Sequence, residues 1–362
     1  MPRMRFRGQK SNSVHIILGD RVIGLGHPPF VIAEMSGNHN QSLARALSIV
    51  DAAAAAGAHA IKLQTYTADT ITLNVRGGDF EISDPGSLWS GQNLHDLYQQ
   101  AHTPWEWHAP IIQRAREHGM VCFSSPFDES AVDFLEELNV PAYKIASFEN
   151  NHLPLIAKAA ATGKPLIIST GMANLGELEQ AVSVARSAGC KDLILLKCTS
   201  TYPSTPTNTN IRTIPHLREL FDCEVGLSDH TMGIGVAIAA VALGATVIEK
   251  HFTLDRAEGG VDSAFSLEPS ELANLVTESE RAWESLGKIT YGPTEAEQKS
   301  LVFRRSIYVA ADIAEGEIFS KENIRIVRPG HGAPPSMYQQ LLGKSAARPY
   351  KKGEPLKFEN LL

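Results

Sequence analysis

Short runs of apolar, often β-branched residues alternate along the chain with longer segments whose apolar residues recur every three or four positions. The short runs have the length and composition of buried strands: Phe30–Glu34, Ala58–Gln64, Met120–Ser124, Ala142–Ala146, Leu166–Ser169, Leu193–Lys197, and one each within Gly226–Gly233 and Val247–Phe252. The longer segments are typical of amphipathic helices: Ser42–Ala56, Trp105–His118, Phe127–Leu138, Leu153–Ala161, Leu175–Ala188, Ile211–Leu220, Val236–Ala245 and Pro269–Leu286.

Strict alternation of eight strands with helices is the sequence form of an α/β fold of the (β/α)8, or TIM barrel, type. Val14–Ile17 and Arg21–Ile23 predict a β-hairpin ahead of it. Asn174, with Glu177 three residues later, predicts a capping box at the start of its helix. Residues 66–103 contain several glycines and prolines, and a loop of that length in a compact domain is usually a cover over an active site.

The last part of the chain has a different pattern, with short β-type segments separated by turns. Gly316–Ile324 is echoed by Gly353–Leu361, which indicates a duplicated turn and strand. We therefore expect a barrel domain with its hairpin at 1–287, a linker at 288–299 and a small, mostly β domain with internal pseudo-symmetry at 300–362.

Polar residues stand at the carboxyl ends of all eight predicted strands. In a (β/α)8 barrel these ends open on one face, where active sites are built. The polar residues gathered there would be Glu34, Lys62, Gln64, Ser124, Ser125, Lys144, Ser147, Glu149, Ser169, Thr170, Lys197, Thr199, Tyr202, Ser228, His230, Glu249 and His251. Eight strand ends with the same polar character are hard to explain by packing alone, so the pattern indicates an active site.

Two histidines, His230 and His251, follow neighbouring strands at this face. With Asp229 and Glu249 beside them, they could hold a divalent metal and leave positions open for substrate or water. In a structural reading, His230 caps the next helix or satisfies a backbone carbonyl, and His251 is a packed residue at the strand end.

The composition argues against several classes of protein: nucleic-acid-binding, secreted and membrane-spanning proteins. With 362 residues, 43% hydrophobic and 20% charged residues, the chain can bury a full-sized core, and a net charge of -7 argues against broad nucleic-acid binding. The four cysteines form no CxxC pair, as expected of reduced thiols in a cytoplasmic protein. The basic N-terminus continues into polar residues, where a signal peptide needs an apolar core, and no apolar run reaches the roughly 18 residues of a membrane span.

The strand-end lysines, Lys62 and Lys144, leave three possibilities open. With Ser147, Ser169 and Ser228 they could recognise a phosphate group, either could form a Schiff base, or each could pair with a neighbouring carboxylate. Schiff-base chemistry would not explain the paired histidines. The sequence contains neither GxGxxG after a strand nor GxxxxGK[ST], so nicotinamide or ATP chemistry is not expected.

Several ordered motifs resemble the sialic acid synthase family. They are Ala33–His39, Ile61–Thr65, Phe123–Phe127, Tyr143–Ser147, Ser169–Met172, Gly226–Thr231 and Glu249–Thr253, continued in the tail by Arg304-Arg305-Ser306 and Arg328-Pro329-Gly330. The likeness covers nearly the whole chain, and the tail is similar to that family's antifreeze-like (SAF) domain. Within the family the chain is most similar to the pseudaminic acid synthases, on Gln64–Thr70, Thr103–His108, Ser147–Glu149 and Leu196–Ser200.

This resemblance implies condensation of phosphoenolpyruvate with an acylated amino sugar and release of phosphate. By the resemblance, phosphoenolpyruvate would be held by Lys62, Ser125, Lys144, Ser147, Ser169 and Ser228. His230 and His251 would bind Mn2+ or Mg2+, which polarises the sugar aldehyde and activates a water, and Glu34 would do acid/base work near that water.

The resemblance also implies sugar contacts from Gln64, Glu149, Tyr202 and Asp262, and from Arg328 of the partner subunit in a domain-swapped homodimer. The loop after Arg328 departs from the family's Arg-Pro-Gly-x-Gly-Ile pattern, because it continues His331-Gly332-Ala333-Pro334. As an alternative, Arg328 is a plain surface residue.

The sequence therefore predicts a metal-dependent pseudaminic acid synthase that uses 2,4-diacetamido-2,4,6-trideoxy-L-altrose. The alternatives are a legionaminic or N-acetylneuraminic acid synthase with the same chemistry, and a non-catalytic sugar-binding protein. Neither nucleic acid nor membrane is expected as a partner.

Overall fold

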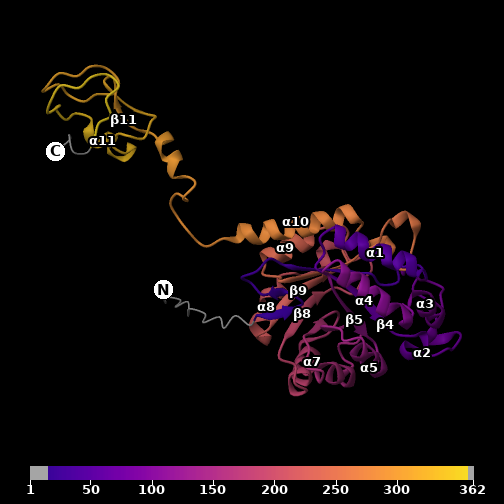
Figure 1. Cartoon of the computed structure of the whole chain (residues 1–362). Helices are drawn as coiled ribbons and strands as arrows, with labels where there is room; N and C mark the ends of the chain where they lie inside the picture. Colours follow the sequence, from indigo (N-terminus) through magenta and orange to yellow (C-terminus); the bar gives the residue numbers. More distant parts are fainter. Residues whose placement is uncertain (1–14, 358–362) are drawn as a thin grey trace. The chain divides into compact units, whose positions relative to one another are not determined.

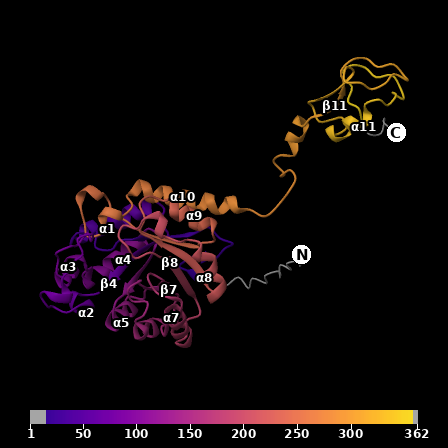
Figure 2. The same ribbon diagram turned by 180° about the vertical axis from the view of Figure 1, so that it is seen from behind.

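The computed structural model describes residues 15–357, which divide into two compact units, one ending at Gly287 and the other beginning at Lys288. Figures 1 and 2 show the chain from opposite sides, coloured along the sequence. Each unit is described by itself. The expected linker 288–299 begins where the second unit begins, and it overlaps the short helix η6 (Gln298–Phe303).

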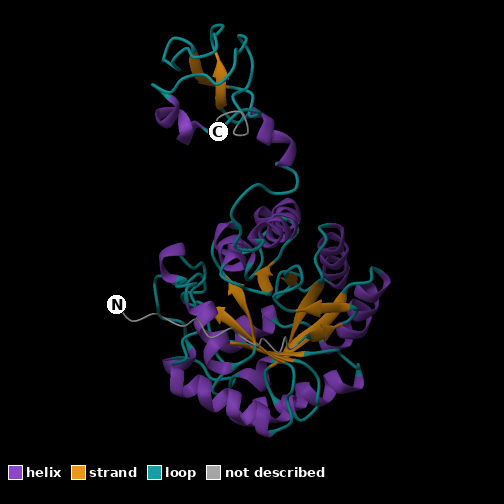
Figure 3. Cartoon of the chain, turned by 90° about the vertical axis from the view of Figure 1, so that its left-hand side faces the viewer, coloured by secondary structure: helices purple, strands orange, loops and turns teal. Residues whose placement is uncertain are grey.

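The first unit is built on a closed barrel of parallel strands, as the alternating pattern predicted. Within the described residues the strands follow one another around the barrel in chain order, and the last pairs with the first: β3 (Phe30–Glu34), β4 (Ala60–Thr65), β5 (Val121–Pro126), β6 (Tyr143–Ile145), β7 (Leu166–Ser169), β8 (Leu193–Cys198), β9 (Glu224–Asp229) and β10 (Val247–His251). The closing pair sets His251 beside Glu34. Figure 3 shows the strands inside a ring of helices.

Helices cover the outside of the barrel. They are α1 (Leu43–Ala55), α4 (His108–Glu117), α5 (Glu129–Glu137), α6 (Leu153–Ala160), α7 (Leu175–Ser187), α8 (Thr213–Phe221), α9 (Gly235–Ala242) and α10 (Pro269–Leu286). In α1 the buried residues are Ala46, Ile49, Val50 and Ala53, at spacings of three and four, so one face of the helix packs on the strands. The predicted capping box of α7 is confirmed, since Asn174 and Glu177 each bond the other's backbone.

The N-terminal hairpin consists of β1 (Ile16–Leu18) and β2 (Arg21–Ile23). Val14, which the sequence placed in the first strand, lies outside the described residues. Ile16 and Ile23 pack with Phe30 and Val247, the first residues of β3 and β10. The hairpin therefore packs against the beginnings of the strands, and the opposite end of the barrel carries the polar residues.

The segment 66–103 is more ordered than a simple loop. It contains α2 (Ala68–Ile71), the short helix η1 (Gly78–Phe80) and α3 (Leu94–Ala101). The expectation of a bare loop was wrong, because Asn93 caps α3 and Leu97 and Ala101 provide a buried face at helical spacing. The remaining short helices of this unit are η2 (Trp105–Trp107), η3 (Pro206–Asn208), η4 (Arg256–Glu258) and η5 (Ser263–Phe265).

The second unit is small and has its own core. Besides η6, its elements within the described residues are β11 (Ser306–Val309), β12 (Ile324–Val327), η7 (Pro335–Met337) and α11 (Tyr338–Leu341), with β11 and β12 antiparallel. Ile307, Phe319, Tyr350 and Leu356 are among the buried residues of its core. The second copy of the echoed segment continues into residues 358–361, which lie outside the described part.

All four cysteines, Cys122, Cys190, Cys198 and Cys223, are buried and form no disulfide. Within residues 15–357, none of the helices combines the length and the apolar character that a bilayer crossing requires.

Candidate active site

A cavity of about 390 Å³ opens among the residues that follow the carboxyl ends of the barrel strands. Its lining includes eleven of the residues that the sequence singled out: Lys62, Gln64, Lys144, Ser147, Glu149, Tyr202, Ser228, His230, Glu249, His251 and Asp262. A cavity of this size suits a small-molecule substrate pair.

The floor of the cavity is an ionic cluster, which we call the ionic floor and define as Glu34, Lys62, Lys144 and Glu249. Lys144 Nζ lies 3.0 Å from Glu249 Oε1, and Lys62 Nζ lies 3.8 Å from Glu249 Oε2 and pairs closely with Glu34. All four side chains are buried. The two lysines therefore point to one place, although 82 residues separate them, and their formal charges are balanced by the two carboxylates.

The two carboxylates of the ionic floor differ in their electrostatics. Burial alone would raise the pKa of Glu249, but the ammonium groups of Lys144 and Lys62 and hydrogen bonds from Lys144 and Ser228 lower it to about 2. Burial raises the pKa of Glu34 against the opposing charge of Lys62. Glu249 is thus a permanent anion between the lysines, whereas Glu34 accepts a proton more readily than an ordinary carboxylate, as a general acid or base must.

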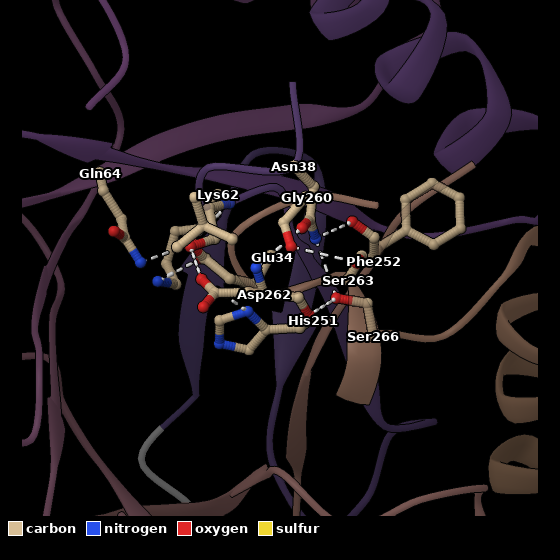
Figure 4. A network of polar contacts seen from close by, with 12 residues as sticks. Glu34, Asn38, Lys62, Gln64, His251, Phe252, Gly260, Asp262, Ser263 and Ser266 are labelled. Atoms are coloured by element: carbon tan, nitrogen blue, oxygen red, sulfur yellow. Dashed lines mark hydrogen bonds and ion pairs between the residues drawn. The ribbon is translucent and has the colours of Figure 1, made fainter. Parts of the chain in front are cut away.

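Glu34 is held in place from both sides. Gln64 Nε2 donates to Glu34 Oε1 at 3.1 Å, and the backbone N–H of Ser36 donates to the same oxygen at 3.1 Å. Figure 4 shows Lys62 and Gln64 reaching the carboxylate of Glu34. The side chain is therefore fixed beside Lys62; it is fully buried and is not among the residues of the cavity lining.

The two histidines lie side by side, with ring centroids 5.3 Å apart. His230 Nδ1 lies 2.9 Å from the backbone oxygen of Thr199, so the structural reading of His230 as a partner for a carbonyl also holds. That hydrogen bond puts a proton on Nδ1 and leaves the lone pair on Nε2. His251 Nδ1 is buried and has no hydrogen-bond partner.

The electrostatics of the two imidazoles differ as well. Burial is the main cause that lowers the pKa of His251 well below its ordinary value. The positive charges of nearby side chains act in the same direction: His230, Lys62, Lys144 and Lys250. Burial also opposes the charged form of His230, but a hydrogen bond with Cys198 raises its pKa overall. His251 is therefore neutral at physiological pH, which is the form that binds metals.

Asp229 lies on the other side of its strand, and the expectation that it stands beside the imidazoles was wrong. Successive side chains of a strand alternate between faces, so Ser228 and Glu249 point into the barrel while Asp229 and Lys250 point outward. Lys250 Nζ lies 3.0 Å from Asp229 Oδ2 and also bonds the backbone oxygens of Thr231 and Gly233. This buried outer pair fixes the loop that carries His230.

Asp262 belongs to a network that ties the loop after β3 to the loop after β10 (Figure 4). Ser36 Oγ donates to Asp262 Oδ2, Asp262 N donates to Asn38 Oδ1 at 3.3 Å, and Asn38 Nδ2 donates to the backbone oxygen of Phe252 at 2.9 Å. Burial raises the pKa of Asp262 to about 6, against the hydrogen bond from Ser36. Asp262 Oδ2 lies 3.7 Å from His251 Nδ1.

Glu149 and Tyr202 are two further residues of the cavity lining. Glu149 Oε2 is buried without a hydrogen-bond partner, and burial raises the pKa of Glu149 to about 7 against the charge of Lys144. The Tyr202 ring lies 4.5 Å from the ring of His230, centroid to centroid. Glu149 therefore offers an unused acceptor to a ligand.

Three predicted contact residues are not in the cavity lining. Ser125 lies behind Lys62 and accepts a hydrogen bond from its Nζ at 3.3 Å. Ser169 is buried on β7, and its Oγ has no partner. Arg328 is an exposed residue after β12 in the second unit.

The lining also contains residues that the sequence reasoning did not select. Ser36 and Cys198 adjoin predicted positions, so their place in the chain was a usable signal. Tyr66, Trp89, Leu94 and Tyr98 come from the segment 66–103. That segment was predicted as a cover, but no local pattern shows which of its side chains face a cavity.

A profile of the NeuB family matches residues 49–291, and a profile of the SAF domain matches residues 304–362. A Campylobacter jejuni protein named pseudaminic acid synthase is 46% identical over 328 residues, which are 91% of this chain and 95% of that protein. A second C. jejuni protein, named N,N'-diacetyllegionaminic acid synthase, is 37% identical over 90% of this chain and 97% of that protein.

Among solved structures, the N-acetylneuraminic acid synthetase of Leptospira borgpetersenii in complex with citrate superposes with a TM-score of 0.70. It is 35% identical, and the match covers 80% of this chain and 95% of that one. These matches agree with the family resemblance read from the motifs.

Proposed function

We propose that this chain, which belongs to the NeuB family and ends in a SAF domain, is a pseudaminic acid synthase. It condenses phosphoenolpyruvate with 2,4-diacetamido-2,4,6-trideoxy-L-altrose and water, giving pseudaminic acid and phosphate. The observation that carries this assignment is the 46% identity, over 91% of the chain, to a protein named for that activity. Legionaminic acid synthesis, with a relative at 37% identity, is the nearest alternative.

The ionic floor supports phosphoenolpyruvate as one substrate. Lys62 and Lys144 meet at Glu249, and Ser228 bonds the same carboxylate at 3.0 Å, so ammonium and hydroxyl donors are already collected at one point. A phosphate and a carboxylate arriving there would share these donors with Glu249. The ion pairs correspond to the third possibility for the lysines, and they hold the ammonium groups ready for an anionic ligand.

The chemistry assigns separate tasks to the chain's own groups. The methylene carbon of phosphoenolpyruvate forms a bond with the sugar aldehyde carbon, and the aldehyde oxygen becomes a hydroxyl by taking up one proton of the water. The water oxygen adds to the carbon that bears the phosphate and becomes the keto oxygen, and phosphate leaves with the bridging oxygen and the second proton. Glu34, whose pKa burial raises, takes up a proton of that water. Gln64 keeps Glu34 oriented, and Glu149, Tyr202 and Asp262 border the space for the sugar.

A divalent metal, Mn2+ or Mg2+, belongs to the proposal, and the residues fit one. A ligand nitrogen lies about 2 Å from a bound first-row metal, so two rings with centroids 5.3 Å apart can share an ion. The unpartnered Nδ1 of His251 fits as well. Within residues 15–357 no set of three or more His, Cys, Asp or Glu side chains is arranged as a metal site, so substrate and water would complete the coordination. When bound, such an ion supplies Lewis-acid polarisation of the aldehyde.

Titration with Mn2+, followed by the electron paramagnetic resonance signal of free ion, tests the metal. We expect one site per chain, lost in His230→Ala and in His251→Ala and kept in His216→Ala, an exposed control. Binding should weaken at low pH, because His230 must lose its proton. Unchanged binding in both active-site variants would refute the assignment.

Phosphate release tests the function. The purified protein is incubated with phosphoenolpyruvate, Mn2+ and one of three sugars: the diacetamido-trideoxy-altrose, the legionaminic acid precursor or N-acetylmannosamine. We expect the altrose derivative to give the highest kcat/KM. A higher kcat/KM with another sugar would assign the chain to the synthases of that sugar's product. Absence of phosphate release with all three sugars would favour a non-catalytic sugar-binding protein.

Substitutions in the cavity separate the two halves of the reaction. His230→Ala and His251→Ala should abolish turnover, whereas Lys144→Ala should mainly raise the KM for phosphoenolpyruvate by about tenfold or more, since it removes one charge-assisted contact. Lys158→Ala, on the outer helix α6, is the control. Normal KM values in Lys144→Ala would contradict the assignment.

Two further parts of the proposal concern context. Arg328 completes the sugar site of a partner subunit in a domain-swapped homodimer, and the protein works in the cytoplasm. The four free cysteines are compatible with a reducing compartment.

A further inference from the structure

The cavity lining also contains a group of apolar and aromatic side chains, and most of them come from one segment. Ile71, Ile82, Trp89, Leu94 and Tyr98 line the cavity, and all five belong to residues 66–103. Each is only partly buried, so each keeps apolar surface exposed toward the cavity. We call these five residues the apolar wall.

The apolar wall is fixed to the barrel and to itself. Trp89 Nε1 donates to the backbone oxygen of Val261 at 3.1 Å, which ties the segment to the loop after β10. Asn93 Nδ2 bonds the backbone oxygens of Val75 at 2.7 Å and Phe80 at 3.2 Å. The rings of Tyr66 and Tyr98 pack edge to face at 5.8 Å. The wall is therefore a preformed surface and not a loose loop.

The ionic floor and the apolar wall require different chemistry from the sugar. At the ionic floor, ammonium, carboxylate and hydroxyl groups of the protein are available to polar groups of a ligand. At the aliphatic residues of the wall, Ile71, Ile82 and Leu94, a sugar hydroxyl would lose water and find no partner, which costs binding. Methyl groups cost nothing there and gain from burial.

We propose that the apolar wall selects the sugar by its methyl groups, accepting a deoxygenated, N-acylated sugar aldehyde in preference to a fully hydroxylated one. This inference rests on the proposed function, because the diacetamido-trideoxy-altrose carries a C6 methyl and two acetyl methyl groups. Glu149, at the border between floor and wall, presents an unpartnered carboxylate oxygen to the N–H of an acetamido group.

Steady-state kinetics on wall variants test the proposal. Ile82→Thr and Leu94→Gln introduce a polar group into the wall, and Leu73→Thr, 63% exposed in the same segment and outside the cavity lining, is the matched control. We expect each wall variant to lower kcat/KM for the trideoxy sugar by roughly 10- to 100-fold. The KM for phosphoenolpyruvate should stay within about twofold, and the preference should shift toward N-acetylmannosamine, as hydrophobic-pocket discrimination predicts.

Two results would overturn the inference: equal losses for both sugars, which indicate general damage, or no loss for either. If the unmodified protein turns over no sugar, the proposed function fails, and the wall is then tested by sugar titration of the protein's tryptophan fluorescence, to which Trp89 contributes. A trideoxy-sugar affinity that is the same in the unmodified protein and in Ile82→Thr would refute the wall's role independently of turnover.

Discussion

At the scale of single residues, the inward or outward direction of a strand side chain decides its role. Lys62, Glu249 and His251 occupy alternate, inward positions of β4 and β10, and all three meet the cavity. Lys250, between two of them, points outward and becomes a structural lysine. The strand-end pattern could identify these residues. Once the strands are assigned, the sequence shows which positions point inward, because side chains alternate between the two faces of a strand.

The pairing of these residues could not be predicted in the same way. Lys144 and Glu249 are 105 residues apart and meet at 3.0 Å, a contact that depends on how the barrel closes. No spacing in the sequence encodes that distance. The unpartnered oxygen of Glu149 is also visible only once the cavity is formed.

Glu149 should make stability depend on pH. Its pKa is raised from 4.5 to about 7 in the folded protein, so the folded state binds the proton more tightly than the unfolded state. This contribution to the free energy of unfolding is present at low pH and is lost as the pH rises from 4.5 through 7. Glu149→Gln carries no charge at any pH. We expect it to be more stable than the unmodified protein by up to about 3 kcal/mol at pH 8, and by less than about 1 kcal/mol at pH 5.

Urea unfolding at the two pH values measures this difference. All four tryptophans, Trp89, Trp105, Trp107 and Trp283, lie in the first unit and report on the barrel. If the stability difference between Glu149→Gln and the unmodified protein is the same at pH 5 and pH 8, Glu149 does not titrate as the structure indicates.

At the scale of elements, the barrel was predictable and its cover was not. Strands β3 and β7 and helix α10 have the predicted bounds, because apolar runs and helix periodicity are local signals. Helices α2 and α3 were missed because they are short and because the surrounding glycines and prolines dominate the pattern. The apolar wall belongs to the same segment and could not be predicted either.

One strand glycine is required by close packing. A Cβ at Gly226 in β9 would lie 2.2 Å from the backbone oxygen of Val247, which cannot move without opening the barrel. Gly226→Ala should therefore cost at least about 3 kcal/mol in the free energy of unfolding. In Gly235→Ala, at the start of α9, the new Cβ meets no atom within 4 Å, and this control should gain about 0.5 kcal/mol. Equal stability of the two variants would contradict the packing argument.

The outer pair of Lys250 and Asp229 should act on catalysis through the His230 loop. Lys250→Met leaves Asp229 buried without its partner and should cost about 3 to 5 kcal/mol of stability. It should also lower kcat more than it raises the KM for phosphoenolpyruvate, because His230 loses its fixed position. Adding Asp229→Asn should restore much of the stability but little of the kcat. Full recovery of both would show a purely structural role.

At the scale of the whole molecule, two units share one chain, and their cores are separate. The change in pattern after residue 287 could be predicted because composition changes there. The partner for Arg328 could not, since the sequence of one chain holds no signal for contacts between copies. The family resemblance alone suggested that contact.

Complementation tests whether Arg328 acts in the partner subunit. Arg328→Ala and His251→Ala should each be inactive as homodimers. Co-expressed, they form mixed dimers in which one site has both residues, so about a quarter of normal turnover should return. No recovery, with mixed dimers present, would mean that Arg328 serves its own subunit or none.

In the proposed reaction, phosphate leaves by cleavage of the carbon–oxygen bond of phosphoenolpyruvate as the new carbon–carbon bond forms. Phosphoenolpyruvate labelled with 18O at the bridging oxygen, incubated with the diacetamido-trideoxy-altrose and Mn2+, tests it by mass spectrometry of the released phosphate. We expect labelled phosphate in equal amount to the pseudaminic acid formed. Unlabelled phosphate, or phosphate released without the sugar, would contradict it.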